Sequence, residues 1–133
     1  MPGFIQVTGA NELAFPDYDG NGMFRSLGNI LVNDDVGLLF VALHGKAQRL
    51  RVNGRATVSD DDPLLASFVG AQLIVRVRAR AIFPNCPRYI PALELDEPSP
   101  YAPRAGVDPP EPAWKSFDIF ADVVPPRRPT CKG

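Results

Sequence analysis

The sequence predicts a mainly β fold: a small, largely antiparallel barrel that carries two short helices. The chain has 133 residues, 45% of them hydrophobic, which is enough for one compact domain with an apolar core. Two later segments alternate between arginine and apolar side chains, as strands with one solvent-facing side do. Of the 15 prolines, 12 lie from Pro84 onward, so regular structure is expected mainly in residues 1–83.

The first elements are expected to form a hairpin. Residues 4–8 resemble a strand and residues 12–15 its partner, because Gly9, Ala10 and Asn11 supply a turn between two apolar runs. Residues 17–22 should follow as a loop, since two glycines and three Asp or Asn residues favour turns over any regular element.

Helical and strand patterns alternate in the middle of the chain. Residues 23–31 carry apolar side chains at helical spacing, which predicts a short helix. Residues 36–43 are a nearly continuous apolar run, typical of a strand that is buried on both faces, inside the barrel and not at its edge. Residues 49–56 and 75–81 are the two alternating strands. Between them, residues 61–65 combine an aspartate cap, a proline in the first turn and two leucines, which predicts a second short helix.

Composition excludes several classes of function. The 14 basic and 15 acidic residues nearly balance, which argues against a nucleic-acid-binding protein. No segment approaches the roughly 20 apolar residues of a membrane span, and no secretory signal pattern is visible, so we expect a cytoplasmic protein with no membrane partner. One histidine and two cysteines are too few for a four-ligand zinc site, and we expect no metal.

Four groups of residues invite a catalytic interpretation but have simpler ones. His44 follows the apolar run in a turn-like segment, which favours a solvated turn residue over a general base. The aspartates at 60–62 lead into the second helix and are interpreted as its cap. The arginines within residues 75–81 are interpreted as a solvent-facing stripe or as salt-bridge partners. Cys86 lies between prolines and is interpreted as a rigid turn residue. With only Cys131 besides, the chain has no disulfide framework, which favours a reduced compartment.

The pattern that points to chemistry is a set of anion-binding groups. Arg25 and Ser26 begin the first predicted helix after the glycine-rich loop. A guanidinium, a hydroxyl and free backbone N–H groups at a helix start suit a phosphate monoester. Arg49 and Arg51 point to one face of their strand, where they can hold a phosphate, or a phosphate and a ring carbonyl. A solvated strand face with dispersed positive charge explains the same spacing.

The order of these motifs resembles the pyridoxamine 5'-phosphate oxidase-like FMN-binding proteins. The resemblance is carried by residues 16–30 (PDYDGNGMFRSLGNI), Asn33, residues 36–40 (VGLLF), residues 49–56 (RLRVNGRA) and residues 85–90 (NCPRYI), and it covers about residues 2–91. Single pieces are weak, but their order and spacing together are specific. The resemblance implies a split β-barrel that forms a homodimer, with FMN in a cleft between the subunits.

The same resemblance assigns roles to the anion-binding residues. By position, Arg25 and Ser26 match the residues at a helix start that hold the flavin phosphate. Arg49 and Arg51 match the strand beside the phosphate and the flavin, and Asn29 is a further contact. No catalytic residue is assigned.

Two departures from the family limit what is expected. Residues 1–91 would form the split-barrel core without the family's N-terminal helix and hairpin, so the chain looks like an N-terminally shortened member with weak, salt-sensitive cofactor binding. Residues 92–133 would be a proline-rich extension that packs on the barrel. Ser26 stands where the vitamin-making oxidases carry lysine, and their arginine-rich substrate motif is not recognisable. Oxidation of pyridoxamine phosphate itself is therefore not expected.

The expected function is that of an FMN-dependent oxidoreductase that acts on an unknown small-molecule substrate. The alternative is a non-catalytic flavin-binding module, or a truncated remnant that binds the cofactor weakly. A deazaflavin or haem in the same fold remains open as the cofactor.

Overall fold

The computed structural model describes residues 4–91, 93–94 and 97–126. Within these residues a single antiparallel sheet has the strand order β1-β2-β5-β4-β3 and is built from β1 (Gln6–Gly9), β2 (Glu12–Tyr18), β3 (Asp35–Ala42), β4 (Gln48–Ser59) and β5 (Ala71–Asn85). The helix α1 (Arg25–Val32) joins β2 to β3, and the 3-10 helix η1 (Pro63–Ser67) joins β4 to β5. Two further 3-10 turns follow in the extension, η2 (Ala113–Ser116) and η3 (Asp118–Phe120). The mainly β fold class is confirmed, and the sheet is consistent with a split barrel that is not closed.

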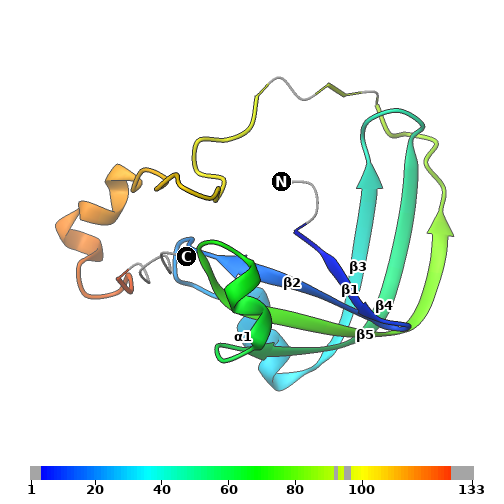
Figure 1. The fold of residues 1–133 in the computed structure, drawn as a ribbon, viewed down its shortest axis with the longest axis horizontal. Coiled ribbons are helices and arrows are strands. Elements are labelled where there is room, and N and C mark those ends of the chain that lie inside the picture. The colour runs from blue at the N-terminus through cyan, green and yellow to red at the C-terminus, as the bar shows by residue number, and fades with distance from the viewer. Residues whose placement is uncertain (1–3, 92, 95–96, 127–133) are drawn as a thin grey trace.

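The sheet bends sharply, and β5 runs through the bend (Figure 1). Residues 71–78 of β5 pair with β2, and residues 74–85 pair with β4. The register between β4 and β5 shifts at Gly54, where Arg80 is an extra residue on β5. A Cβ on Gly54 would lie 2.2 Å from the carbonyl oxygen of Arg78, so this close approach of two strands requires glycine.

The core lies on both faces of the sheet, in the part that β2, β4 and β5 share. On one face, Leu27 and Ile30 of α1 pack against a cluster that contains Ala56, Val75 and Val77. On the other face, η1 packs against Ala14 and Ile74. Each helix therefore covers one face at the same end of the sheet, and the end formed by the β3–β4 turn is left without a helix (Figure 1).

The predicted cap of the second helix is confirmed. Asp62 precedes η1, and its carboxylate accepts a hydrogen bond from the backbone N–H of Leu64. The same carboxylate pairs with Arg76 of β5, so the salt-bridge interpretation of that arginine is confirmed as well. Arg80 pairs with Asp35 at the surface, whereas Arg78 is exposed.

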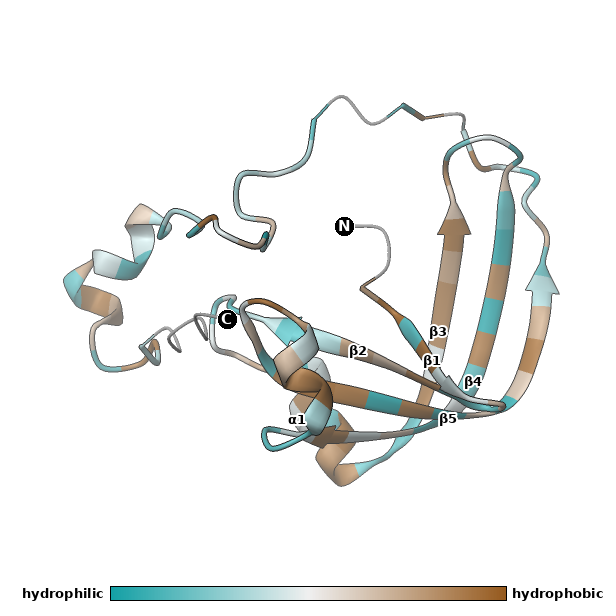
Figure 2. Cartoon of the chain, viewed as in Figure 1, coloured by the Kyte–Doolittle hydropathy of each residue, from teal (hydrophilic) through white to brown (hydrophobic). Residues whose placement is uncertain are grey.

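The prediction for residues 36–43 was wrong in its burial and its position. Among the described residues β3 pairs only with β4, so it is an edge strand, and none of its side chains is fully buried. Leu39 is 48% and Val41 40% exposed. Figure 2 shows β3 as an almost unbroken hydrophobic strand beside the banded β4. The face with Val36 and Leu38 packs partly against the cluster that α1 covers. The opposite face, with Leu39 and Val41, has no covering element among the described residues.

The remaining differences concern the ends of elements. β2 extends to Tyr18, so the predicted loop begins two residues late, and α1 begins at Arg25 and not at Met23. Pro84 belongs to β5, which contradicts the expected end of regular structure at residue 83. A proline is tolerated at position 84 because this part of β5 pairs only with β4 among the described residues. The missing N–H of Pro84 therefore removes no hydrogen bond to a strand on the other side of β5.

Candidate functional site

The N-terminus of α1 presents the first group of predicted residues. Arg25 and Ser26 are its first two residues, and both are exposed, as is Asn29 one turn later. The helix has no side-chain cap and no acidic residue in its first turn, so no carboxylate there competes for an anion. Leu27 and Ile30 turn toward the sheet, which leaves Arg25, Ser26 and Asn29 on the outer surface. These three residues are brought together.

A strained residue positions this helix start. Phe24 has φ 45° and ψ 33°, the left-handed conformation that residues other than glycine rarely adopt. The loop before it is held by a hydrogen bond from the backbone N–H of Met23 to Oδ1 of Asn21 at 3.1 Å. Such backbone strain costs about 1–3 kcal/mol and is concentrated at binding and catalytic sites. The strain therefore agrees with a ligand-binding role for the residues that follow.

Arg49 and Arg51 form the second group, at the beginning of β4. Arg51 lies opposite Leu39 of β3 and Phe83 of β5, and Arg49 lies opposite Val41 and Asn85. All of these side chains share one face of the sheet, because cross-strand partners point the same way. The two guanidinium groups thus stand within a strip of partly exposed apolar side chains, which suits a planar ligand with polar atoms at its edge.

Arg49 also has an unsatisfied donor. Its Nε is buried and has no hydrogen-bond partner among the described residues, a property it shares with Arg104. A buried donor without an acceptor costs about 1–3 kcal/mol. No carboxylate among the described residues pairs with Arg25, Arg49 or Arg51, whereas Arg76 and Arg80 are paired. An oxyanion or a ring carbonyl would satisfy the group at Arg49.

The structure does not bring the two groups onto one face of the sheet. α1 packs against the face that carries Ala56, and strand alternation points Arg49 and Arg51 to the opposite face. One protomer therefore presents the helix-start group and the strand group separately.

The structure also locates the other residues that invited a catalytic interpretation. His44 is exposed in the turn between β3 and β4, and Cys86 is an exposed free thiol. Cys131 lies outside the described residues. Within the described part of the chain, no cluster of three or more His, Cys, Asp and Glu side chains could hold a metal ion. No described helix is both long and apolar enough to cross a membrane.

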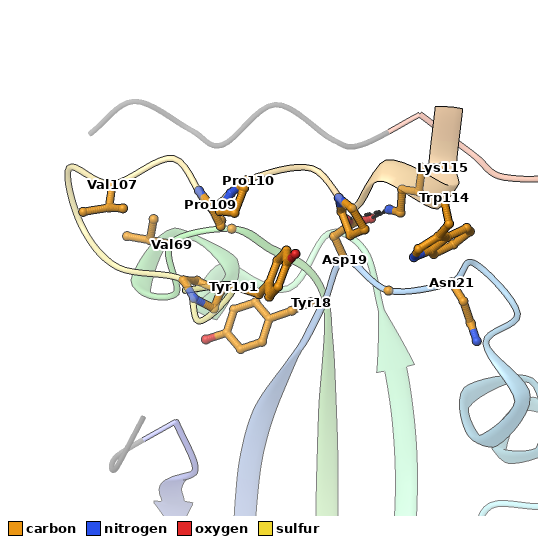
Figure 3. Close-up of a pocket in the computed structure, with 14 residues that line it drawn as sticks. Tyr18, Asp19, Asn21, Val69, Tyr101, Val107, Pro109, Pro110, Trp114 and Lys115 are labelled. Atoms are coloured by element: carbon orange, nitrogen blue, oxygen red, sulfur yellow. Dashed lines mark hydrogen bonds and ion pairs between the residues drawn. The ribbon is translucent and has the colours of Figure 1, made fainter. Parts of the chain in front are cut away.

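Sequence reasoning missed a cavity between the loop after β2 and the proline-rich extension. Its volume is about 310 Å³, and it is lined by Tyr18, Asp19, Tyr101 and Trp114, among others. Nζ of Lys115 donates to both carboxylate oxygens of Asp19 at 2.7 Å and closes the wall (Figure 3). The extension showed only its prolines in the sequence, and no local pattern links Lys115 to a partner 96 residues away.

Comparison with known proteins agrees with the fold and with the order of the motifs. The family model described as pyridoxamine 5'-phosphate oxidase matches residues 1–98. That range contains the whole sheet, α1 and both groups of predicted site residues, and it ends before the residues of the extension that line the cavity. No curated protein matches the chain. Members of the matched family are in general FMN-binding flavoproteins. The chain belongs to the pyridoxamine 5'-phosphate oxidase family.

Proposed function

We propose that this protein binds FMN and acts as a flavin-dependent oxidoreductase on a small molecule. Arg25, Ser26 and Asn29 would hold the flavin phosphate, and Arg49 and Arg51 would contact the ring and its carbonyl groups. The flavin supplies the electron transfer, while the protein binds and orients it. The observation that carries the proposal is the buried, unsatisfied Nε of Arg49 within an exposed apolar strip, in a chain of this family.

The two groups of residues are best explained as halves of a site that two subunits complete. One protomer places them on opposite faces of its sheet. A homodimer would place the helix-start group of one subunit against the strand group of its partner. The partly exposed Leu39, Val41 and Phe83 around the strand group would then be covered by the second copy.

The direct test of the proposed function is a flavin titration of the purified chain. FMN fluorescence should be quenched to saturation, and riboflavin, which lacks the phosphate, should bind more weakly. A deazaflavin mononucleotide and haem test the alternative cofactors, because each should displace bound FMN if it occupies the same site. If FMN shows no saturable binding at micromolar protein, or binds no better than riboflavin, the proposed phosphate site is wrong.

The two-subunit site is tested by mixing variants. In a mixed dimer of Arg25→Ala and Arg49→Ala subunits, one of the two sites keeps both arginines if the groups come from different subunits. FMN should then bind to the purified mixed dimer at about half of the wild-type stoichiometry, and to an unseparated equal mixture, of which about half is mixed dimer, at about a quarter, although each variant alone binds weakly. If both groups came from one subunit, mixing the variants would restore no FMN binding. That result would contradict the two-subunit arrangement, but it would not contradict the proposal that the wild-type protein binds FMN.

Oxidoreductase activity needs a separate measurement from binding. Bound FMN that is bleached by an electron donor and recovers its absorbance in the presence of an acceptor over many turnovers would support an enzyme. Bound FMN that exchanges no electrons with any donor, while free FMN in the same solution does, would support the alternative of a non-catalytic flavin-binding module.

A further inference from the structure

The cavity beside the proline-rich extension is separate from the proposed flavin residues. It lies between the Tyr18–Asn21 segment, the Val69–Gly70 turn and the extension, and none of the five proposed flavin-contacting residues lines it. Most of its lining belongs to residues beyond 98, outside the part of the chain that the family model matches. The cavity therefore depends on a part of the chain that the family match does not describe.

The wall of the cavity is held in place by an ion pair between buried Lys115 and partly exposed Asp19. The side chain of Lys115 is only 6% exposed, and its ammonium group bonds both oxygens of Asp19. The neighbouring Trp114 packs edge to face against Phe120, with ring centroids 5.7 Å apart. In Figure 3 the ion pair lies between Tyr18 and Tyr101 on one side and Trp114 on the other. The site is thus preformed by contacts that do not depend on a ligand.

The residues that line the cavity favour a planar, uncharged ligand with hydrogen-bond acceptors. Three aromatic side chains and several prolines offer flat apolar surfaces, which favour a planar molecule. The charges of Asp19 and Lys115 neutralise each other, so the cavity offers no net charge to an ionic ligand. No hydrogen bond occupies the hydroxyl groups of Tyr18 and Tyr101 within the described residues. Burial raises the pKa of Tyr18, so that its hydroxyl stays protonated and can donate to an acceptor.

We propose that this cavity binds a neutral, planar heterocycle of one or two rings that carries carbonyl or ring-nitrogen acceptors. Its volume of about 310 Å³ lies at the lower end of the ~300–1,000 Å³ range of small-molecule sites, which excludes long or branched ligands. The aromatic faces contact the ring system, and the tyrosine hydroxyls donate to its acceptors. This ligand occupies a place of its own and does not displace FMN.

The single tryptophan of the chain makes the proposal directly measurable, because Trp114 lines the cavity. Quinazolin-4-one serves as the probe, with 1-decalone as its saturated, non-planar counterpart and a carboxylated quinazolinone as its anionic counterpart. Saturable quenching of Trp114 fluorescence by quinazolin-4-one, confirmed by calorimetry, is expected. Both counterparts should bind at least tenfold more weakly. Equal binding of all three probes, or no saturable binding up to their solubility limits, would overturn the proposal.

Two variants test whether quinazolin-4-one binds in this cavity. Tyr101 is 53% and Val107 48% exposed, so Tyr101→Ala and Val107→Arg should fold and should each weaken quinazolin-4-one binding at least fivefold. Tyr89→Ala is the matched control, because Tyr89 is 83% exposed and does not line the cavity. Unchanged binding in both cavity variants would show that the probe binds elsewhere. Displacement of the probe by saturating FMN would show that the cavity belongs to the flavin site.

Discussion

Arg76 donates two hydrogen bonds to the carboxylate of Asp62, from Nε to Oδ2 at 2.6 Å and from Nη2 to Oδ1 at 3.0 Å. A third donor of the same guanidinium, Nη1, reaches Oε1 of Glu12 at 2.9 Å. The side chain of Asp62 is only 6% exposed, so the pair is largely shielded from water. These bonds join η1, the middle of β5 and the beginning of β2 into one unit.

Removal of this arginine should destabilise the fold. We expect Arg76→Met to lower the free energy of unfolding by about 2–4 kcal/mol, because it leaves a buried carboxylate without its countercharge. Arg78→Met is the matched control on the same strand and the same face, and it should change stability by less than about 0.5 kcal/mol. Urea denaturation of the two variants measures both values, and equal losses would show that the Arg76 pair contributes nothing specific.

The same network should make stability depend on acidic pH. Hydrogen bonds from Arg76 lower the pKa of Asp62, and bonds from Thr8 and then Arg76 lower that of Glu12. A carboxyl group with a lowered folded pKa contributes stability that is present above its unfolded pKa and is lost as pH falls through its folded pKa. The free energy of unfolding should therefore decline below about pH 4 more steeply in the wild type than in Arg76→Met. Parallel slopes in denaturation series at several pH values would contradict this.

The proposed contacts of the two arginine groups with FMN should contribute a measurable share of the binding free energy. Arg25→Ala or Arg49→Ala should weaken FMN binding by about 1.5–3 kcal/mol, the range for hydrogen bonds to charged groups. Arg78→Ala should have little effect, since Arg78 is an exposed side chain far from either group in the sequence. Fluorescence titration of apo protein gives all three dissociation constants. Losses of the same size at all three positions would mean that the arginines act only through overall charge.

Two glycines should respond in opposite directions to alanine. At Gly54 the added Cβ would lie 2.2 Å from the backbone oxygen of Arg78, so Gly54→Ala should destabilise the sheet by at least about 2 kcal/mol. At Gly28, inside α1, nothing lies within 4 Å, and Gly28→Ala should stabilise the protein by about 0.5–1 kcal/mol. Thermal unfolding of the pair checks both signs, and a tolerated Gly54→Ala would disprove the close strand approach.

The proposed homodimer should depend on the β3 surface. Leu39 and Val41 are partly exposed beside the strand group, so Leu39→Lys together with Val41→Lys should convert a dimer into monomers. The control is Val7→Lys on β1, where the side chain is 82% exposed at the opposite edge of the sheet. Analytical ultracentrifugation at micromolar concentration reports the result. Dissociation by Val7→Lys alone would instead assign the interface to β1, and a monomeric wild type would reject the dimer.

Local patterns predicted the strands and helices well because their causes are local. Alternation along residues 49–56 and the apolar spacing in α1 depend only on neighbouring residues, and the cap at Asp62 depends on its own turn. The burial of β3 could not be predicted in the same way. An apolar run shows that a surface must be covered, but it does not show whether the same chain provides the cover.

The site was only partly accessible to sequence reasoning. Spacing grouped Arg25 with Ser26 and Arg49 with Arg51, and the family resemblance supplied the ligand. That the two pairs face opposite sides of the sheet follows from strand register, which depends on pairing between distant segments. The cavity beside the extension rests on the contact between Asp19 and Lys115, for which neither residue has a distinctive local sequence.

The central position of β5 also has a consequence for biosynthesis. Tyr18, the last residue of β2, pairs with Ala71, so the first hairpin waits for a partner that is made 53 residues later. At about 5–20 residues per second, this delay lasts roughly 3–10 seconds, during which Leu13 and Phe15 remain without their neighbours from β5. We expect nascent chains to need chaperone protection in this interval, and slower translation before residue 71 to lower the yield of soluble protein.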